Sequence, residues 1–345
     1  SPAGSALAYA LAFVGASIAP LYVVWLSAEV FNLSVVFFAY FLWFYKDVAA
    51  APTTRVERWL HSPSSDIVAA VLLGLAVFSK FMPAALVVPP VLHLWSQRRF
   101  RHGLVVGCLA AAVSWAGFGV NAAITGEFNY QGGLDRKYVA GEFPFEPGAE
   151  WDDLGVDVST NTVVVEESGG WVANFRLLPR NLWYFLVGRH FGFVPFFFPG
   201  VVAVVLLLRA RREARAWQWA TLGTAVFVAA FLAVWMPYTW SGGGGPSGNR
   251  YYLTVYALFL FLTPPLRGVT PAIVACVGGW GFVGQILVNP FVSAKEPYLA
   301  PERGLLRLLP VELTMGRDLP IALDQPRTRG LHGNNPRAQL YFLDH

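Results

Sequence analysis

The chain has 345 residues, of which 55% are hydrophobic and only 13% are charged. These fractions exclude an ordinary soluble globular domain and predict an all-α integral membrane protein that crosses the bilayer several times. The formal net charge of +4 is modest, so the composition gives no reason to expect a nucleic-acid partner.

Apolar runs close to the length of a bilayer span recur along the whole chain. They predict a bundle of about nine transmembrane or half-membrane helices, some of them short. In chain order the runs cover residues 6–26, 33–45, 67–78, 83–95, 104–120, 193–208, 217–235, 251–266 and 272–288. Cys108 and Cys276 lie inside such runs, so we expect packing residues rather than a disulfide or a metal pair.

Three connectors between the runs are rich in positive charge, which marks cytoplasmic loops. They hold Lys46, Arg55 and Arg58, then Arg98, Arg99 and Arg101, and then Arg209, Arg211, Arg212 and Arg215. With these connectors inside, strict alternation puts Lys80, the stretches 27–32, 124–192 and 236–250, and everything after residue 289 outside. The sequence thus predicts a bacterial plasma (inner) membrane protein whose functional face points to the periplasm or the outside.

The same alternation divides the chain into two parts. We expect a transmembrane domain over residues 1–289 and the start of an outer soluble domain, truncated, over 290–345. The outer loop 124–181 is too long for an ordinary helix connection. It leads into an expected interfacial helix at about 178–192. The missing initiator Met and the strand-like last residues make us expect that the sequence is an internal fragment.

A glycine-rich stretch, residues 241–248, leads into Arg250 at the start of an apolar run. An arginine where a membrane helix meets water is either a snorkelling anchor or a contact for an anionic ligand. Residues 243–248 also fit G-x-G-x-x-G, but no strand precedes them, so we do not expect a dinucleotide site.

Three segments carry a family resemblance. Residues 249–257, Asn-Arg-Tyr-Tyr-Leu-Thr-Val-Tyr-Ala, resemble the Arg-Tyr-apolar motif that opens a late helix in the C-type (GT-C) polyprenyl-phosphate-dependent membrane glycosyltransferases. Residues 72–86, which include Lys80, are similar to their glycine, leucine and lysine stretch. Residues 27–32, with Glu29, resemble their short acidic outer turn. Together the three cover roughly the first four-fifths of the chain.

The resemblance implies transfer of a hexose or pentose from a polyprenyl-phosphate donor to an acceptor on the outer face. The acceptor is an envelope glycan, lipid or protein. The family's catalytic carboxylate normally lies on a first outer loop, which here would precede Ser1. Glu29 is the remaining candidate for the catalytic carboxylate within the sequence, and it could also bind the acceptor, partner Lys80 or act as a bare anchor.

Donor chemistry requires cations, because the leaving phosphate carries negative charge. The candidates are Arg250, Lys80, Arg189 and His190, and Lys80 could instead pair structurally with a carboxylate. Asp135, Arg136 and Lys137 in the outer loop are further substrate-binding candidates, or a solvated turn. No cofactor is certain, but a divalent cation on Glu150, Asp152 and Asp153 stays open.

Two other functions stay open. The chain could be a transporter or flippase for a lipid-linked or anionic substrate, or a non-catalytic membrane subunit that binds lipid. A transporter should hold its charges near the bilayer midplane on discontinuous helices, whereas most candidate residues here fall at one face. That asymmetry favours an enzyme.

Overall fold

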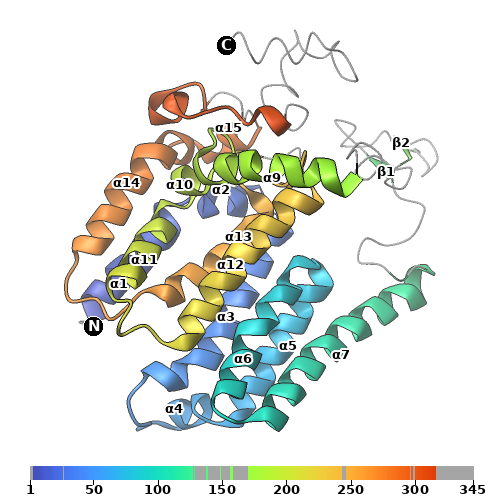
Figure 1. Cartoon of the computed structure of the whole chain (residues 1–345), viewed down its shortest axis with the longest axis vertical. Coiled ribbons are helices and arrows are strands. Elements are labelled where there is room, and N and C mark those ends of the chain that lie inside the picture. Colours follow the sequence, from blue (N-terminus) through green and yellow to red (C-terminus); the bar gives the residue numbers. More distant parts are fainter. Residues whose placement is uncertain are drawn as a thin grey trace.

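A computed structural model describes residues 3–25, 27–126, 128, 137–138, 148, 156–157, 170–242, 246–295, 297 and 300–315. Most of these residues are helical, and the longer helices run side by side in one bundle (Figure 1). Two strands of two residues each, β1 (Lys137–Tyr138) and β2 (Val156–Asp157), pair antiparallel beside the bundle. The predicted helical membrane fold is therefore confirmed at the level of its class.

The first half of the chain contributes α1 (Ala3–Gly15), α2 (Ala19–Val24), α3 (Ala28–Val48), α4 (Arg55–Leu60), α5 (Pro63–Ser79), the 3-10 helix η1 (Met82–Val87), α6 (Val88–Ser96) and α7 (Phe100–Thr125). The second half contributes α9 (Gly170–Val187), α10 (Phe193–Phe196), α11 (Phe198–Arg209), α12 (Ala216–Trp235), α13 (Arg250–Tyr256), η3 (Ala257–Leu262), α14 (Thr270–Leu287), α15 (Pro290–Lys295), η4 (Gly304–Leu308) and η5 (Leu313–Met315).

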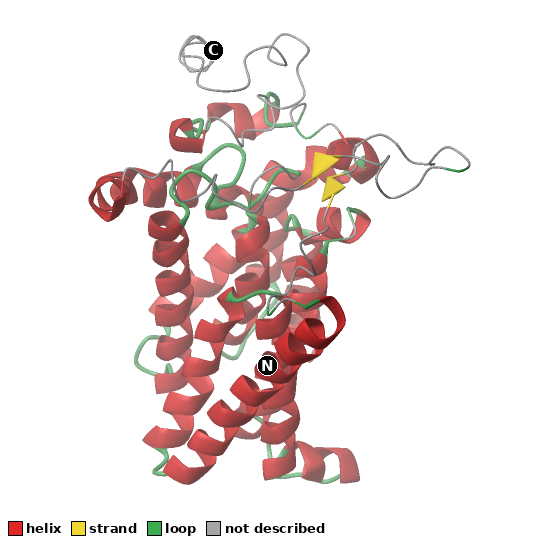
Figure 2. Cartoon of the chain, turned by 90° about the vertical axis from the view of Figure 1, so that its right-hand side faces the viewer, coloured by secondary structure: helices red, strands yellow, loops and turns green. Residues whose placement is uncertain are grey.

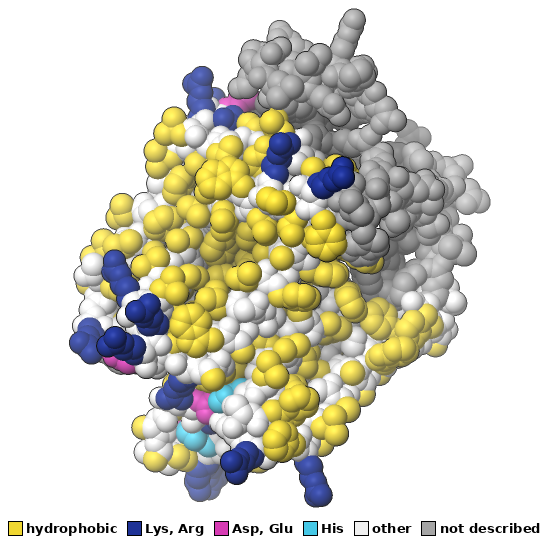
Figure 3. Space-filling model, in the orientation of Figure 1, with side chains coloured by type: hydrophobic (Ala, Val, Ile, Leu, Met, Phe, Trp, Pro, Cys, Tyr) yellow, Lys and Arg dark blue, Asp and Glu magenta, His cyan; other side chains and the backbone are white. Residues whose placement is uncertain are grey.

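Four of the described helices are long and apolar enough to cross a membrane: α3, α7, α12 and α14. Shorter apolar helices lie beside them, namely α1, α5, η1 joined to α6, α11, and α13 joined to η3. Hydrophobic side chains cover the flank seen in Figure 3, and most of the visible Lys and Arg side chains lie toward its ends. The multi-pass character is supported, but the predicted count of about nine spans is not confirmed.

The prediction of one helix over residues 6–26 is wrong. The chain leaves helical geometry after Gly15 and starts again as α2 at Ala19. Pro20 explains the restart, because proline lacks an N–H and is tolerated only in the first turn of a helix. At the break, Ile18 donates its backbone N–H to Phe196 O at 2.9 Å and so bonds across to another segment.

The helix expected at about 178–192 is α9, which starts earlier, at Gly170, and ends at Val187. Arg189 and His190 therefore lie in the turn after the helix rather than in its last turn. With α10 and α15, α9 lies across one end of the bundle (Figures 1 and 2). This is the end that the charge pattern predicts to be outside.

The connectors on either side of α4 and before α7 lie at the opposite end (Figure 1), and Arg215 of the third connector donates to the carbonyl of Asp47 in the last turn of α3. A buried carboxylate ties the helices together there: Asp66 of α5 accepts from Lys46 Nζ of α3 at 2.5 Å and pairs with His102 Nε2 of α7 at 2.8 Å. Asp66 is 1% exposed, so this network joins three helices inside the bundle, and loss of a cation would leave a buried carboxylate uncompensated.

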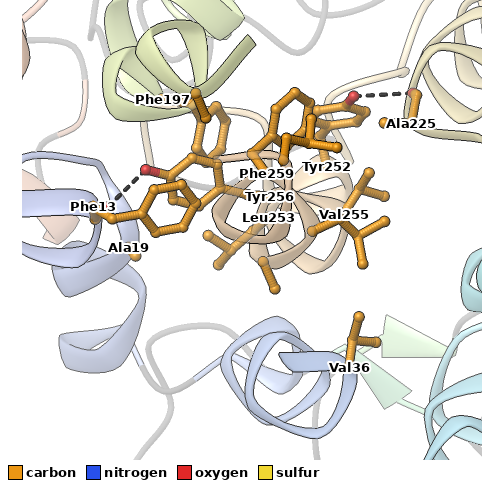
Figure 4. Packing of buried hydrophobic residues seen from close by; sticks show 14 of the residues in the cluster. Phe13, Ala19, Val36, Phe197, Ala225, Tyr252, Leu253, Val255, Tyr256 and Phe259 are labelled. Atoms are coloured by element: carbon orange, nitrogen blue, oxygen red, sulfur yellow. Dashed lines mark hydrogen bonds between the residues drawn. The ribbon is translucent and has the colours of Figure 1, made fainter. Parts of the chain in front are cut away.

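The seven residues of α13 pack in the middle of the bundle, held by two tyrosine hydroxyls (Figure 4). Tyr252 Oη donates to Ala225 O of α12 at 3.0 Å. Tyr256 Oη donates to Phe13 O of α1 at 2.7 Å, while its ring stacks on that of Phe13 at 4.2 Å. Apolar contacts alone would allow α13 to shift along its axis, whereas these hydrogen bonds fix its position in the bundle.

The predicted orientation can be tested with two exposed glutamates at opposite ends, Glu213 between α11 and α12 and Glu302 between α15 and η4. In a protein whose exposed Cys108 and Cys276 have been replaced by alanine, Glu302→Cys should react with a membrane-impermeant thiol reagent in intact cells. Glu213→Cys should react only after the cells are permeabilised. The reverse pattern would place the Glu302 end in the cytoplasm.

Candidate functional site

Three of the predicted site residues come together at the end of the bundle that carries α9. Lys80 Nζ lies 3.1 Å from Glu29 Oε1, and Arg250 Nε lies 3.9 Å from the same oxygen. The residues come from the first turn of α3, the end of α5 and the start of α13. We refer to Glu29, Lys80 and Arg250 as the ion triad.

Local sequence places each member. Glu29 is in the first turn of α3, where the helix dipole stabilises a negative charge. Lys80 ends α5 in an extended conformation, with φ −152° and ψ 134°. Arg250 opens α13 directly after the cap Asn249, whose side-chain oxygen accepts the N–H of Tyr252 at 2.9 Å.

The Arg250 side chain lies over Gly242. This glycine has φ +103°, and a Cβ on it would lie 2.6 Å from both Cγ and Nε of Arg250. The backbone of Arg250 makes a second contact with this loop: Arg250 N donates to Ser241 O at 3.1 Å. The conformation and the close approach both require glycine at position 242.

The triad presents its cations outward and keeps its carboxylate inside. The side chains of Lys80 and Arg250 are each 26% exposed, against 5% for Glu29. One carboxylate and two cations leave a net charge of +1. A group approaching from solvent therefore meets positive charge, which is an arrangement suited to an anion.

Two aromatic rings border the cations. Lys80 Nζ lies 5.0 Å from the centre of the Tyr251 ring. Arg250 Cζ lies 5.5 Å from the Tyr251 ring centre and 5.7 Å from that of Trp25. Such contacts hold the cations without neutralising them. The rings also offer flat apolar faces beside the positive charge.

Buried polar atoms without a hydrogen-bond partner among the described residues are frequent in the two stretches of chain that carry Glu29 and Arg250. Eight fall in the two stretches 27–32 and 239–250: Ser27 Oγ, Glu29 Oε1, Asn32 Oδ1, Thr239 Oγ1, Trp240 Nε1, Ser241 Oγ, Asn249 Nδ2 and Arg250 Nε. Glu29 Oε1 has its ion pairs, but their geometry falls short of a hydrogen bond. Most of the others can donate, and buried donors are normally satisfied by protein, water or ligand.

Arg189 and His190 do not join the triad. Arg189 donates through Nε to Leu309 O at 3.1 Å and through Nη2 to Arg307 O at 2.8 Å. Burial lowers the pKa of Arg189, and the nearby Glu312 opposes that effect. His190 Nδ1 pairs with Glu312 Oε2 at 2.9 Å. The structure thus engages both side chains with the segment 307–312.

Other predicted positions are not tested. Asp135 and Arg136 lie outside the described residues, as do Glu150, Asp152 and Asp153. Lys137 is described only through its backbone, where it pairs with Asp157 in the small strand ladder. Within the described part of the chain, no group of three His, Cys, Asp or Glu side chains could hold a metal ion.

Sequence reasoning missed two parts of the site. Trp25 follows α2, a separate short helix that the single apolar run 6–26 did not predict. The contact of its ring with Arg250 was therefore not expected. Glu312 was assigned to an outer domain, and its local sequence did not reveal its burial, because Glu is almost never fully buried unless it is paired. It is fully buried in the structure.

Comparison of the chain with models of known protein families, with curated proteins and with solved structures finds no match. The site must therefore be interpreted from its own residues.

The close approach of Gly242 to Arg250 generates a prediction. Gly242→Ala should destabilise the protein by about 2–3 kcal/mol, from backbone strain and overlap with Arg250 together. In an Arg250→Ala background the overlap is gone, so the same substitution should cost only about 1 kcal/mol. Thermal unfolding in detergent measures both. Gly223→Ala on α12, where a Cβ meets nothing within 4 Å, is the control. Equal losses of stability in the two backgrounds would contradict the close contact between Gly242 and the Arg250 side chain.

Proposed function

We propose that the protein is a membrane glycosyltransferase that moves a sugar from a polyprenyl-phosphate donor to an acceptor at the outer face of the plasma membrane. The observation that carries the proposal is the ion triad, in which Lys80 and Arg250 share Glu29 and remain partly exposed at one end of an apolar bundle. Chemistry supports the proposal, because cations at the edge of the bilayer would neutralise the phosphate of a lipid-linked donor.

In the proposed reaction, an acceptor hydroxyl oxygen forms a bond to the anomeric carbon while the bond from that carbon to the phosphate oxygen breaks, and the hydroxyl proton is released to water. The lipid phosphate leaves with added negative charge, which Lys80 and Arg250 would neutralise. Glu29 is 3% exposed behind these cations, so in this proposal it orients them and does not take the acceptor proton. The rings of Trp25 and Tyr251 would pack against the sugar.

A simple anchor role fits Arg250 poorly. It begins α13, whereas the helix dipole favours cations at the C-terminal end. Its guanidinium turns toward Glu29 instead of reaching away from the bundle, and its Nε has no hydrogen-bond partner in the described structure. A phosphate oxygen would satisfy that donor.

An apolar groove of about 370 Å³ lies on the flank of the bundle, between η1–α6 and α12. Ala85, Val88, Ala220, Gly223, Thr224 and Phe227 line it. Lys80 lies two residues before η1 and five residues ahead of Ala85. If the phosphate of a lipid bound at Lys80, this groove could hold part of its hydrocarbon chain. The groove therefore supports the proposal of a lipid-linked donor.

The depth of the ion triad along α3 favours the proposed transferase over a transporter. The 21 residues of α3 rise about 31 Å, close to the thickness of the hydrocarbon core. Glu29 is the second residue of α3, so the triad falls at the edge of the core and not at the midplane that transporters use. The break between α1 and α2 is a feature that a transporter would share.

The exchange of arginine for lysine at position 250 tests the proposal. Arg250→Lys keeps the charge but loses the planar fork that binds two phosphate oxygens. Transfer from a radiolabelled polyprenyl-phosphate sugar, assayed in membranes that carry the protein, should fall by about 5-fold to 150-fold, or about 1–3 kcal/mol.

Arg98→Lys, on the connector at the other end of the bundle, is the matched control and should retain full transfer. Equal transfer by the two variants would reduce Arg250 to an anchor. Accumulation of bound or translocated donor without any transfer, in the unaltered protein, would favour the transporter instead.

A further inference from the structure

Glu312 is a fully buried carboxylate that accepts three hydrogen bonds from one turn of the chain. Its Oε1 accepts the backbone N–H groups of His190 at 2.8 Å and Phe191 at 2.9 Å. Its Oε2 accepts from His190 Nδ1 at 2.9 Å. The turn provides room for it, because a Cβ on Gly188 would overlap Oε1. Backbone and side chain of His190 are thus fixed by a residue 122 positions later.

The fixed turn then holds the loop before α13. His190 O accepts the N–H of Gly248 at 2.6 Å. On the other side of the same residue, Gly248 O accepts from Tyr22 Oη at 2.8 Å. Both backbone polar groups of Gly248 are therefore bonded to segments far away in sequence, which immobilises it.

Arg250 is two residues beyond this fixed point. Asn249, between them, is 1% exposed and caps α13, and Arg250 N is bonded to Ser241 O. Any shift of Gly248 must move the start of α13 and the guanidinium with it. The path from Glu312 through His190 and Gly248 to Arg250 consists of backbone hydrogen bonds and the buried hydrogen bonds between His190 and Glu312.

We propose that His190, seated by Glu312, is a positioning residue that sets the place of Arg250 in the ion triad. His190 thus acts on the phosphate site through the backbone of Gly248 without touching the ligand itself. The ligand class, a polyprenyl phosphate, rests on the proposed function, whereas the positioning of Arg250 does not.

Two variants separate positioning from general stability. His190→Leu keeps a buried apolar volume but removes the side-chain bond to Glu312 Oε2, whereas the two backbone N–H bonds to Oε1 do not depend on this side chain. His190→Asn restores a donor at the atom that corresponds to Nδ1. Arg189→Gln is the matched control: its side chain holds the same segment, through Leu309 O and Arg307 O, and makes no bond to the described residues of the loop before α13.

The first readout needs no ligand. Hydrogen exchange of the purified protein, followed on a peptide that covers residues 246–256, should be at least about tenfold faster in His190→Leu. It should return close to the unaltered rate in His190→Asn and stay unchanged in Arg189→Gln. Unchanged exchange in a folded His190→Leu protein would overturn the inference.

The second readout is the affinity for polyprenyl monophosphate in detergent. His190→Leu should weaken it about tenfold, and His190→Asn should restore it. In an Arg250→Lys background His190→Leu should add less than about twofold, because the fork that it positions is already gone. A full tenfold loss in that background overturns the path through Arg250. If the unaltered protein binds no polyprenyl phosphate while exchange responds as expected, the proposed function fails and the positioning stands.

Discussion

The carboxylate of Glu29 is shared by two cations that come from different parts of the chain, and this sharing constrains the end of the bundle that carries α9. A carboxylate that is almost completely buried is costly unless cations compensate its charge. Lys80 and Arg250 supply that compensation, so the end of α5 and the start of α13 must both reach the first turn of α3. Because the two cations stay partly exposed, the same arrangement that satisfies Glu29 also leaves positive charge at the surface.

The triad depends on how the short helix α13 is held. Helix packing between apolar surfaces has little register of its own in a bilayer, since lipid tails are as apolar as the side chains. Here buried tyrosine hydroxyls supply the register by donating to backbone carbonyls of other segments: Tyr9 to Pro199, Tyr22 to Gly248, Tyr40 to Leu86, Tyr252 to Ala225 and Tyr256 to Phe13. Three of these bonds involve α13 or the loop before it, which places Arg250 within the reach of Glu29.

Composition and charge pattern predicted the class of fold, because the length of an apolar run and the position of arginines are local properties. They also indicated Glu29, Lys80 and Arg250, since a charge at the end of an apolar run is visible in the sequence. The pair of Glu29 with Lys80 was one of the alternatives that the sequence left open, and the structure shows it at 3.1 Å. The approach of Arg250 to the same carboxylate was not predicted. His190 and Arg189 were predicted, like Arg250, to be cations of the donor site. In the structure His190 is bonded to Glu312, and Arg189 is bonded to the carbonyls of Arg307 and Leu309. Hydropathy averages over a window, so it also missed the break that brings Trp25 to the site.

The central claim is that the ion triad binds the phosphate of a lipid carrier, and the most direct test compares two lipids that differ only in that phosphate. Binding of polyprenyl monophosphate and of the matching polyprenol to the purified protein should be measured in detergent at one ionic strength. The account predicts that the phosphate-bearing lipid binds at least about tenfold more tightly, and that Lys80→Met combined with Arg250→Met removes this difference. Equal binding of the two lipids by the unaltered protein, or an unchanged preference in the double variant, would contradict it.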